Sequence, residues 1–216
     1  MRFPTRPRLL PVLCAVALAL SLAALCSPAL AQDAQPEPPK ATKRPPASTL
    51  PQTAAEREKT LSDLYALLAT ADDEGSANAI AEGIERIWVH SGSPTVDLLL
   101  GRAMKAIGEK HMDKALRFLD HALEQAPDFT EAWSRRAFVH FQRNEIDQAL
   151  GDLRRALALD PNNFKVLDGL GQVMREIGQK KAALQVFRQL REVHPYWPNV
   201  DRMVDELSRE VEGQGI

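Results

Sequence analysis

The sequence is poor in cysteine, and the position of its thiols excludes most cysteine chemistry. Of the 216 residues only Cys14 and Cys26 are cysteines, and both lie within residues 1–31, which have the features of a cleavable leader. A chain without that leader has no disulfide, no cysteine metal ligand and no cysteine nucleophile.

The leader has the three parts of a secretory signal peptide. Three arginines precede an uncharged apolar run over residues 9–25, and the segment ends in the small-x-small pattern at residues 29–31. This pattern predicts a signal peptide at 1–31 that is cleaved between Ala31 and Gln32. An uncleaved or lipidated N-terminus would instead anchor the chain, although a bulky leucine precedes the second cysteine, where lipidation signals usually have a small residue. We therefore expect an exported, periplasmic protein, with a membrane-anchored protein that faces the periplasm as the alternative.

An excess of positive charge is also missing. The net charge is −2, and removal of the three arginines of the leader, which contains no acid, makes it −5. An acidic chain has no electrostatic basis for binding nucleic acid or anionic lipid. We expect no nucleic-acid partner, and membrane contact only through an uncleaved N-terminus.

Proline is concentrated in one stretch that lacks aromatic residues. Residues 32–53 contain six prolines, a composition that cannot form a core and predicts an extended, disordered linker. A capping-box spacing at Thr53 and Glu56 then predicts the start of a helix, in a helical hairpin over residues 54–92. After that hairpin, Ser93 is placed to cap the next helix. Because apolar and polar residues do not alternate with period two, we expect no sheet and an all-α fold.

One pattern recurs without a gap every 34 residues, in units at 96–129, 130–163 and 164–197. The eighth, twentieth and thirty-second places of the units carry small residues or proline: Ala103, Ala137 and Gly171; Ala115, Ala149 and Ala183; Pro127, Pro161 and Pro195. This pattern resembles the tetratricopeptide repeat (TPR), a 34-residue helix hairpin. The resemblance implies a right-handed α-solenoid of three TPR hairpins. The predicted N-terminal hairpin can cover one end of it, and a capping helix at 198–213 the other.

Some positions depart from the family pattern. Arg102 and Arg136 stand at the seventh place, where the family usually has leucine, which suggests polar contacts between the helices of a unit. We predict that Arg136 pairs with Asp152.

Motifs of catalysis and metal binding are missing. The chain has no nucleophile elbow and no glycine-rich phosphate loop, and no two of its five histidines are three or four residues apart. We therefore expect no catalytic residue, no metal and no cofactor. An enzyme would need a constellation that forms only in three dimensions.

In the TPR family, ligands usually lie against the first helix of each unit, at the second, fifth, ninth and twelfth places. The resemblance therefore implies a partner-binding groove formed by Asp97, Leu100 and Met104 of the first unit, Glu131, Ser134, Phe138 and Phe141 of the second, and Lys165, Asp168, Gln172 and Arg175 of the third. Ile107 and Phe141, both at the twelfth place, can alternatively belong to the core. The terminal-carboxylate clamp of chaperone-binding members is not matched, because only Lys165 fits it.

An apolar strip with Phe138 on its surface predicts a site for a peptide or helix of another protein. The N-terminal hairpin or a second copy of the chain could also fill it. The sequence thus predicts a non-enzymatic adaptor or scaffold of the bacterial cell envelope. Its alternatives are a membrane-tethered assembly subunit and a self-associating scaffold, which would be a homo-oligomer.

Overall fold

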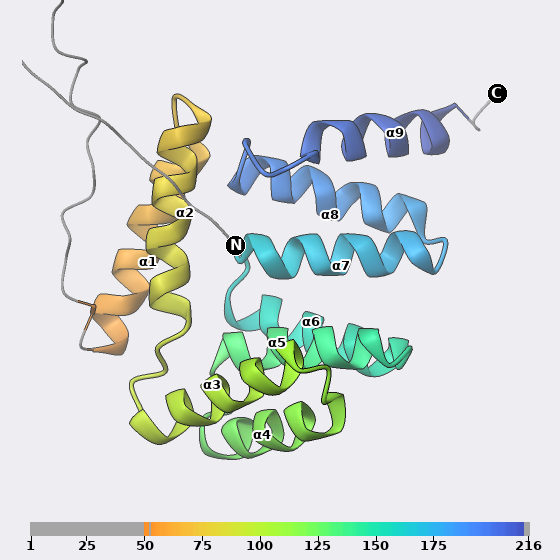
Figure 1. Cartoon of the computed structure of the whole chain (residues 1–216). Coiled ribbons are helices and arrows are strands. Elements are labelled where there is room, and N and C mark those ends of the chain that lie inside the picture. Colours follow the sequence, from red (N-terminus) through yellow and green to blue (C-terminus); the bar gives the residue numbers. More distant parts are fainter. Residues whose placement is uncertain (1–49, 52, 214–216) are drawn as a thin grey trace, which may run out of the picture. The chain divides into compact units, whose positions relative to one another are not determined.

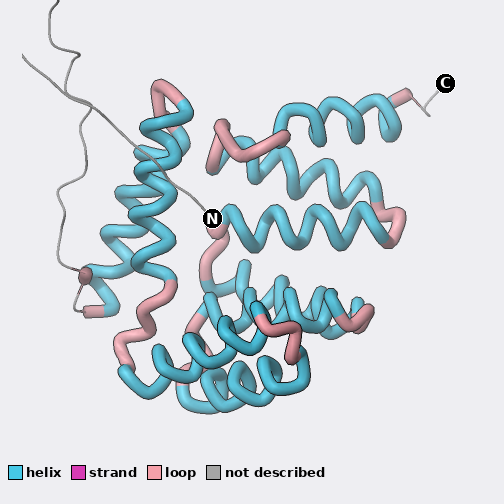
Figure 2. The backbone as a smooth tube through the Cα atoms, in the orientation of Figure 1, coloured by secondary structure: helices cyan, strands magenta, loops and turns pink. Residues whose placement is uncertain are grey.

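The computed structural model describes residues 50, 51 and 53–213, and these residues form nine α-helices and no strand (Figures 1 and 2). The helices are α1 (Ala54–Ala69), α2 (Glu74–Trp88), α3 (Pro94–Gly108), α4 (Met112–Gln125), α5 (Thr130–Gln142), α6 (Ile146–Leu159), α7 (Phe164–Glu176), α8 (Lys180–Val193) and α9 (Val200–Glu212). The all-α prediction is confirmed. The predicted signal peptide, its cleavage site and most of the predicted linker lie outside the described residues.

The three repeat units use the same turn between their helices. The residue at the fifteenth place has a left-handed backbone, with φ of 60° at Lys110, 60° at Asn144 and 77° at Gly178. In each unit the next backbone N–H then donates to the carbonyl five residues earlier, at 2.8 to 2.9 Å. Only one of the three turn residues is a glycine, although glycine adopts this conformation at the least steric cost. Asparagine also tolerates this conformation, so only Lys110 adopts it against its local preference, and there the packing of the two helices imposes the turn.

Small residues let the two helices of each unit approach closely. The alanines at the eighth and twentieth places are buried, with exposed fractions of 1% or less. In the third unit the eighth place is Gly171, and a Cβ atom there would lie 2.6 Å from two ring carbons of Phe187. Phe187 stands at the twenty-fourth place, where the first two units have Leu119 and Leu153, so the third unit combines a smaller residue at the eighth place with a larger one at the twenty-fourth.

A polar network joins the second unit internally, as the sequence predicted. Arg136 of α5 donates to both carboxylate oxygens of Asp152 on α6, each at 2.8 Å, and this confirms the predicted pair. The same guanidinium also reaches Asp120 of α4 at 2.8 Å and lies 4.6 Å from the ring centroid of Trp133. An arginine at the seventh place thus links two successive units.

The N-terminal hairpin of α1 and α2 does not stack on the outer face of the first repeat, which corrects the expectation of an end cap. It contributes instead to one core cluster with residues of α6, α7, α8 and α9, while most of the first repeat belongs to a second cluster. Trp88 packs on Phe164 with ring centroids 4.7 Å apart, and the Tyr196 hydroxyl donates to the Asp72 carbonyl at 2.9 Å. In Figure 1 the hairpin runs across the direction of α7 and α8 instead of alongside them. It covers the edge where α7 begins and α8 ends.

Of the two predicted helix N-caps, the one at Thr53 forms as expected and the one at Ser93 only in part. The capping box is present, since the Glu56 N–H donates to the Thr53 hydroxyl at 3.2 Å and the Thr53 N–H donates to the Glu56 carboxylate at 3.1 Å. Ser93 does occupy the N-cap position of α3, but its side chain makes no capping hydrogen bond. The carboxylate of Asp97 instead accepts hydrogen bonds from the backbone and side chain of Ser91.

At the other end, α9 is an amphipathic helix that covers α8. Four apolar residues on one face of this helix are buried: Val200, Met203, Val204 and Leu207. Over the described part of the chain, no helix combines the length and the apolar character needed to cross a membrane.

Candidate functional site

The predicted groove has one exposed apolar strip, at the ninth places of the first two units. Met104 of α3 is 40% exposed and Phe138 of α5 is 44% exposed, although both are large apolar side chains. Because α3 and α5 are in contact and these residues have the same register in their units, they lie on the same side of the array. Phe141 is half-buried and packs against the core, which agrees with the alternative that it belongs to the core rather than to the groove.

Other predicted groove residues of these two units support the fold. Leu100 is 2% exposed and belongs to the core of the first repeat. Glu131 is 3% exposed, and its carboxylate lies 2.6 Å from the guanidinium of Arg135. The Asp97 carboxylate accepts a hydrogen bond from the Ser91 N–H, and Ser134 is half-buried. Fewer of the predicted groove residues are therefore available to a partner than their places in the repeat implied.

Much of the third unit's part of the groove is occupied by the chain itself. Lys165 forms a 2.7 Å ion pair with Glu85 of the N-terminal hairpin. Gln172 donates to Asp168 and lies 3.4 Å from the sulfur of Met203 on α9. Burial raises the pKa of the Asp168 carboxyl, against the hydrogen bond from Gln172. Among the four predicted residues of this unit, only Arg175 is exposed, and the other three are half-buried.

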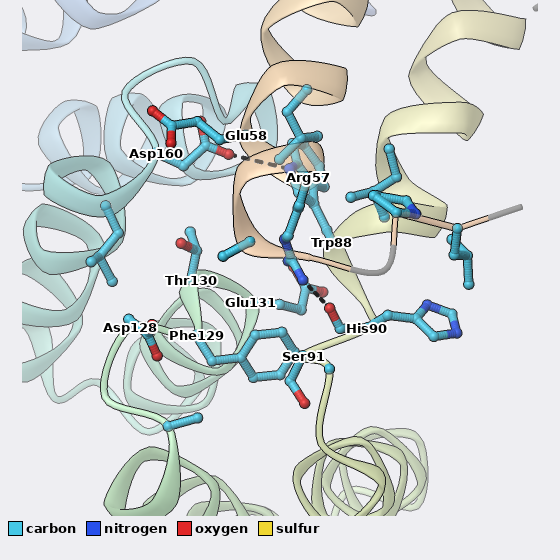
Figure 3. A pocket seen from close by; sticks show the side chains of 18 of the residues that line it. Arg57, Glu58, Trp88, His90, Ser91, Asp128, Phe129, Thr130, Glu131 and Asp160 are labelled. Carbon is cyan, nitrogen blue, oxygen red and sulfur yellow. Dashed lines mark hydrogen bonds between the residues drawn. The ribbon is translucent and has the colours of Figure 1, made fainter. Parts of the chain in front are cut away.

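The structure also contains a cleft that the sequence did not predict. It has a volume of about 760 Å³ and lies between the start of α1 and the three turns at residues 89–94, 126–130 and 159–162 (Figure 3). Leu61, Ile87 and Phe129 provide apolar wall, and the guanidinium of Arg57 donates to the His90 carbonyl within it.

A hydrogen-bonded triad closes one side of this cleft. The Tyr65 hydroxyl donates to the Asp160 carboxylate at 2.6 Å, and the Trp88 indole N–H contacts both the Tyr65 hydroxyl, at 3.1 Å, and the Asp160 carboxylate, at 3.2 Å. Burial raises the pKa of Tyr65, so the phenol remains a donor at physiological pH. Burial also raises the pKa of Asp160, while the hydrogen bonds from Tyr65 and Trp88 act in the opposite direction. The triad ties α1 and α2 to the loop before α7.

The charge of the cleft is predominantly negative. Among the described residues that line it, Arg57 is the only lysine or arginine, whereas five residues are acidic: Glu58, Asp97, Asp128, Glu131 and Asp160. Burial lowers the pKa of Arg57, whereas the negative charges of Asp160, Asp97 and Asp128 raise it. These three carboxylates are therefore near enough to the Arg57 guanidinium to interact with it electrostatically. In Figure 3, Asp160 and Asp128 lie above and below one another to the left of the Arg57 side chain, and Glu131 lies near its lower end.

Sequence reasoning could not find this cleft, because its residues come from distant segments. Tyr65 and Asp160 are 95 residues apart, and neither belongs to a motif with recognisable spacing. In the part of the chain that the structure describes, no three histidine, cysteine or acidic side chains converge in a way that could hold a metal ion.

Comparison with known proteins identifies the repeats. Family models described as the tetratricopeptide repeat match residues 130–163 and 165–195. A TPR repeat-containing protein of Rhizobium etli is 30% identical over 179 residues, which cover 77% of this chain and 88% of the relative. This chain therefore belongs to the tetratricopeptide repeat family.

Solved structures agree on the fold. The TPR domain of Arabidopsis OM64 superposes with a TM-score of 0.52 at 19% identity, over 54% of this chain and 97% of that domain. The first TPR domain of Spaghetti (RPAP3), bound to the HSP90 peptide SRMEEVD, superposes with a TM-score of 0.53 at 17% identity, over 56% of this chain and 95% of that one. The repeats of this chain thus form an all-α TPR solenoid.

Proposed function

We propose that this TPR protein is a non-enzymatic adaptor of the bacterial cell envelope that holds an apolar peptide or helix of a partner protein in its groove. The observation that carries the proposal is the exposure of Met104 and Phe138 at equivalent places of two neighbouring units. Each of these large apolar residues is 40% or more exposed to water, and burial against a partner would stabilise a complex.

The comparisons support a protein as the partner. The RPAP3 domain with the same fold holds a peptide of another protein. The groove proposed here differs from a site for a terminal carboxylate, because it is apolar in the first two units and the fitting lysine, Lys165, is paired with Glu85. The ligand we propose is therefore an apolar segment that lies across α3 and α5.

A periplasmic location is part of the proposal and depends on the leader. The signal-peptide pattern of residues 1–31 supports export. An anchored N-terminus would place the same groove at a membrane surface, and self-association would place a second copy of the chain in it.

The test is co-purification from native cells with a matched pair of substitutions. Phe138→Asp introduces a charge into the groove, and Gln148→Asp introduces the same charge at an exposed position of α6 outside it. We expect a partner protein to co-purify with the wild type and with Gln148→Asp, and to be lost with Phe138→Asp. Equal recovery with both variants would contradict the groove, and recovery of the tagged chain's own copies alone would assign the groove to self-association.

A further inference from the structure

The cleft beside α1 lies where the preceding part of the chain enters the described structure. Leu50 and Pro51, the first two described residues, line it together with the first turns of α1. Both are half-buried, and Leu50 makes contacts of its own. The segment immediately before them therefore starts at the cleft, whatever course it takes.

The cleft has a charge that such a segment can complement. Its one guanidinium, Arg57, already donates to the His90 carbonyl, and the Glu131 carboxylate is paired with Arg135. The side chains of Glu58 and Asp128 are exposed, and no ion pair within the described residues uses either carboxylate. Together with the half-buried Asp160, they leave the cleft with more negative than positive charge.

The chain just before Leu50 carries the opposite charge within reach. Residues 43–49 have the sequence Lys-Arg-Pro-Pro-Ala-Ser-Thr, so two adjacent cations stand six and seven residues before Leu50. Six residues of extended chain span at most about 20 Å, which is enough to fold back over a cleft of about 760 Å³. The two prolines lower the conformational entropy lost on ordering. Covalent attachment also gives the segment a local concentration on the order of millimolar, so that even a weak contact is populated.

We propose that this cleft is the docking site of the chain's own basic segment, Lys43 and Arg44, held by Asp128, Glu58 and Asp160. The segment that leads to the repeats then starts at residue 43 rather than at Leu50, so its tether is seven residues shorter. This inference is independent of the function proposed for the groove. Its site is acidic, whereas the proposed groove is apolar, and it involves neither Met104 nor Phe138.

Disulfide trapping tests the proposal with two neighbouring positions of α1. A chain that begins at Gln32 keeps every described residue and has no native cysteine, so Thr42→Cys can be combined with either Ala54→Cys or Ala55→Cys, and neither change removes a proposed carboxylate. Ala54 lines the cleft, whereas Ala55 does not line it, and both residues are exposed. They stand four and five residues after Leu50, so the two disulfides close loops that differ by one residue.

We expect the 42–54 disulfide to form at least about fivefold faster than the 42–55 disulfide at low salt. The preference should disappear in 0.5 M sodium chloride, on the order of a 4 Å Debye length, and in a Lys43→Glu/Arg44→Glu background. The reversal Arg154→Glu/Arg155→Glu, at two exposed arginines of α6, should leave it unchanged.

Equal trapping rates at the two positions, or a preference that survives reversal of Lys43 and Arg44, would overturn the proposal. A titration with acetylated tetralysine tests whether the cleft instead binds basic segments of other proteins. If this peptide shifts the Trp88 indole NMR signal while trapping shows no preference, the cleft binds basic segments of other proteins and not this one.

Discussion

Removal of a single hydroxyl tests how the N-terminal hairpin is held on the repeats. In Tyr65→Phe the ring stays in its 7% exposed position, and only the oxygen that donates to Asp160 at 2.6 Å is lost. A hydrogen bond to a charged group contributes about 1.5 to 3 kcal/mol, and we expect the lower part of that range because Asp160 is half-buried. The Trp88 N–H keeps an acceptor in Asp160, so no buried donor is left unpaired.

The matched control is Tyr196→Phe, which removes the same atom from a tyrosine that is 36% exposed and donates to the Asp72 carbonyl. Its expected cost is about 0.5 kcal/mol or less. Urea unfolding followed by circular dichroism measures both, and a loss of about 2 kcal/mol lowers the midpoint by roughly 1 M for a slope near 2 kcal/mol/M. Equal losses in the two variants would refute the assignment of the triad as the main polar link of the hairpin.

The pH dependence of the Tyr65→Phe effect gives a second check. Burial raises the pKa of Asp160 in the folded chain, and the Tyr65 hydroxyl opposes this shift because it stabilises the ionised carboxylate. The variant should therefore have a still higher Asp160 pKa. Its loss of stability should be complete at neutral pH, where the carboxylate is ionised, and should shrink as the pH falls through the raised pKa. A loss that stays constant down to acid pH would contradict this account.

Three further predictions concern the repeats. Gly171→Ala should destabilise the chain by about 1 to 3 kcal/mol because its Cβ atom would meet the ring of Phe187, whereas Gly151→Ala, whose Cβ atom has no neighbour within 4 Å, should stabilise it by roughly 0.5 to 1 kcal/mol. Thermal unfolding of the two variants checks this, and shifts of the same sign would contradict it. Because burial lowers the pKa of His194, the wild type should lose stability as the pH falls below about 6.5, where the unfolded chain takes up the proton, and His194→Phe should show a smaller loss in urea titrations at pH 7.5 and 5.5. An unchanged difference between the two pH values would count against a buried neutral imidazole. Phe138→Asp should change the free energy of unfolding by about 1 kcal/mol or less, since its side chain is 44% exposed, so that urea unfolding separates lost binding from lost fold.

The fold was accessible from the sequence because its information is periodic. Small residues repeated every 34 positions predict close helix pairs, and Arg136 in place of an apolar residue predicts a polar partner in the facing helix. The position of the N-terminal hairpin was not accessible in the same way. Its apolar face, with residues such as Leu68 and Ile84, indicates that the hairpin is buried against something, but periodicity contains no information about which surface that is. The surface that the hairpin covers depends on the packing of Trp88 on Phe164, which stands 76 positions later in the chain.

The groove was predictable in outline and not in detail for a related reason. Register assigns residues to a face of a helix, and it correctly placed an exposed aromatic residue at Phe138. It cannot tell whether another part of the chain covers that face. Glu85 pairs with Lys165, and Glu131 is buried beside Arg135, so two groove positions are used by the fold itself. The acidic cleft depends on four separate segments and leaves no trace in local spacing.

The central claim is that a partner protein lies on the first two units and leaves the third to the chain's own hairpin and cap. The most direct measurement is photo-crosslinking in cells, with the crosslinking residue placed either at Phe138 or at Gln172, followed by mass spectrometry of the products. We predict that one partner protein is captured from position 138, with at least about tenfold less of it from position 172. Equal capture from both positions, or products that contain only this chain, would contradict the claim.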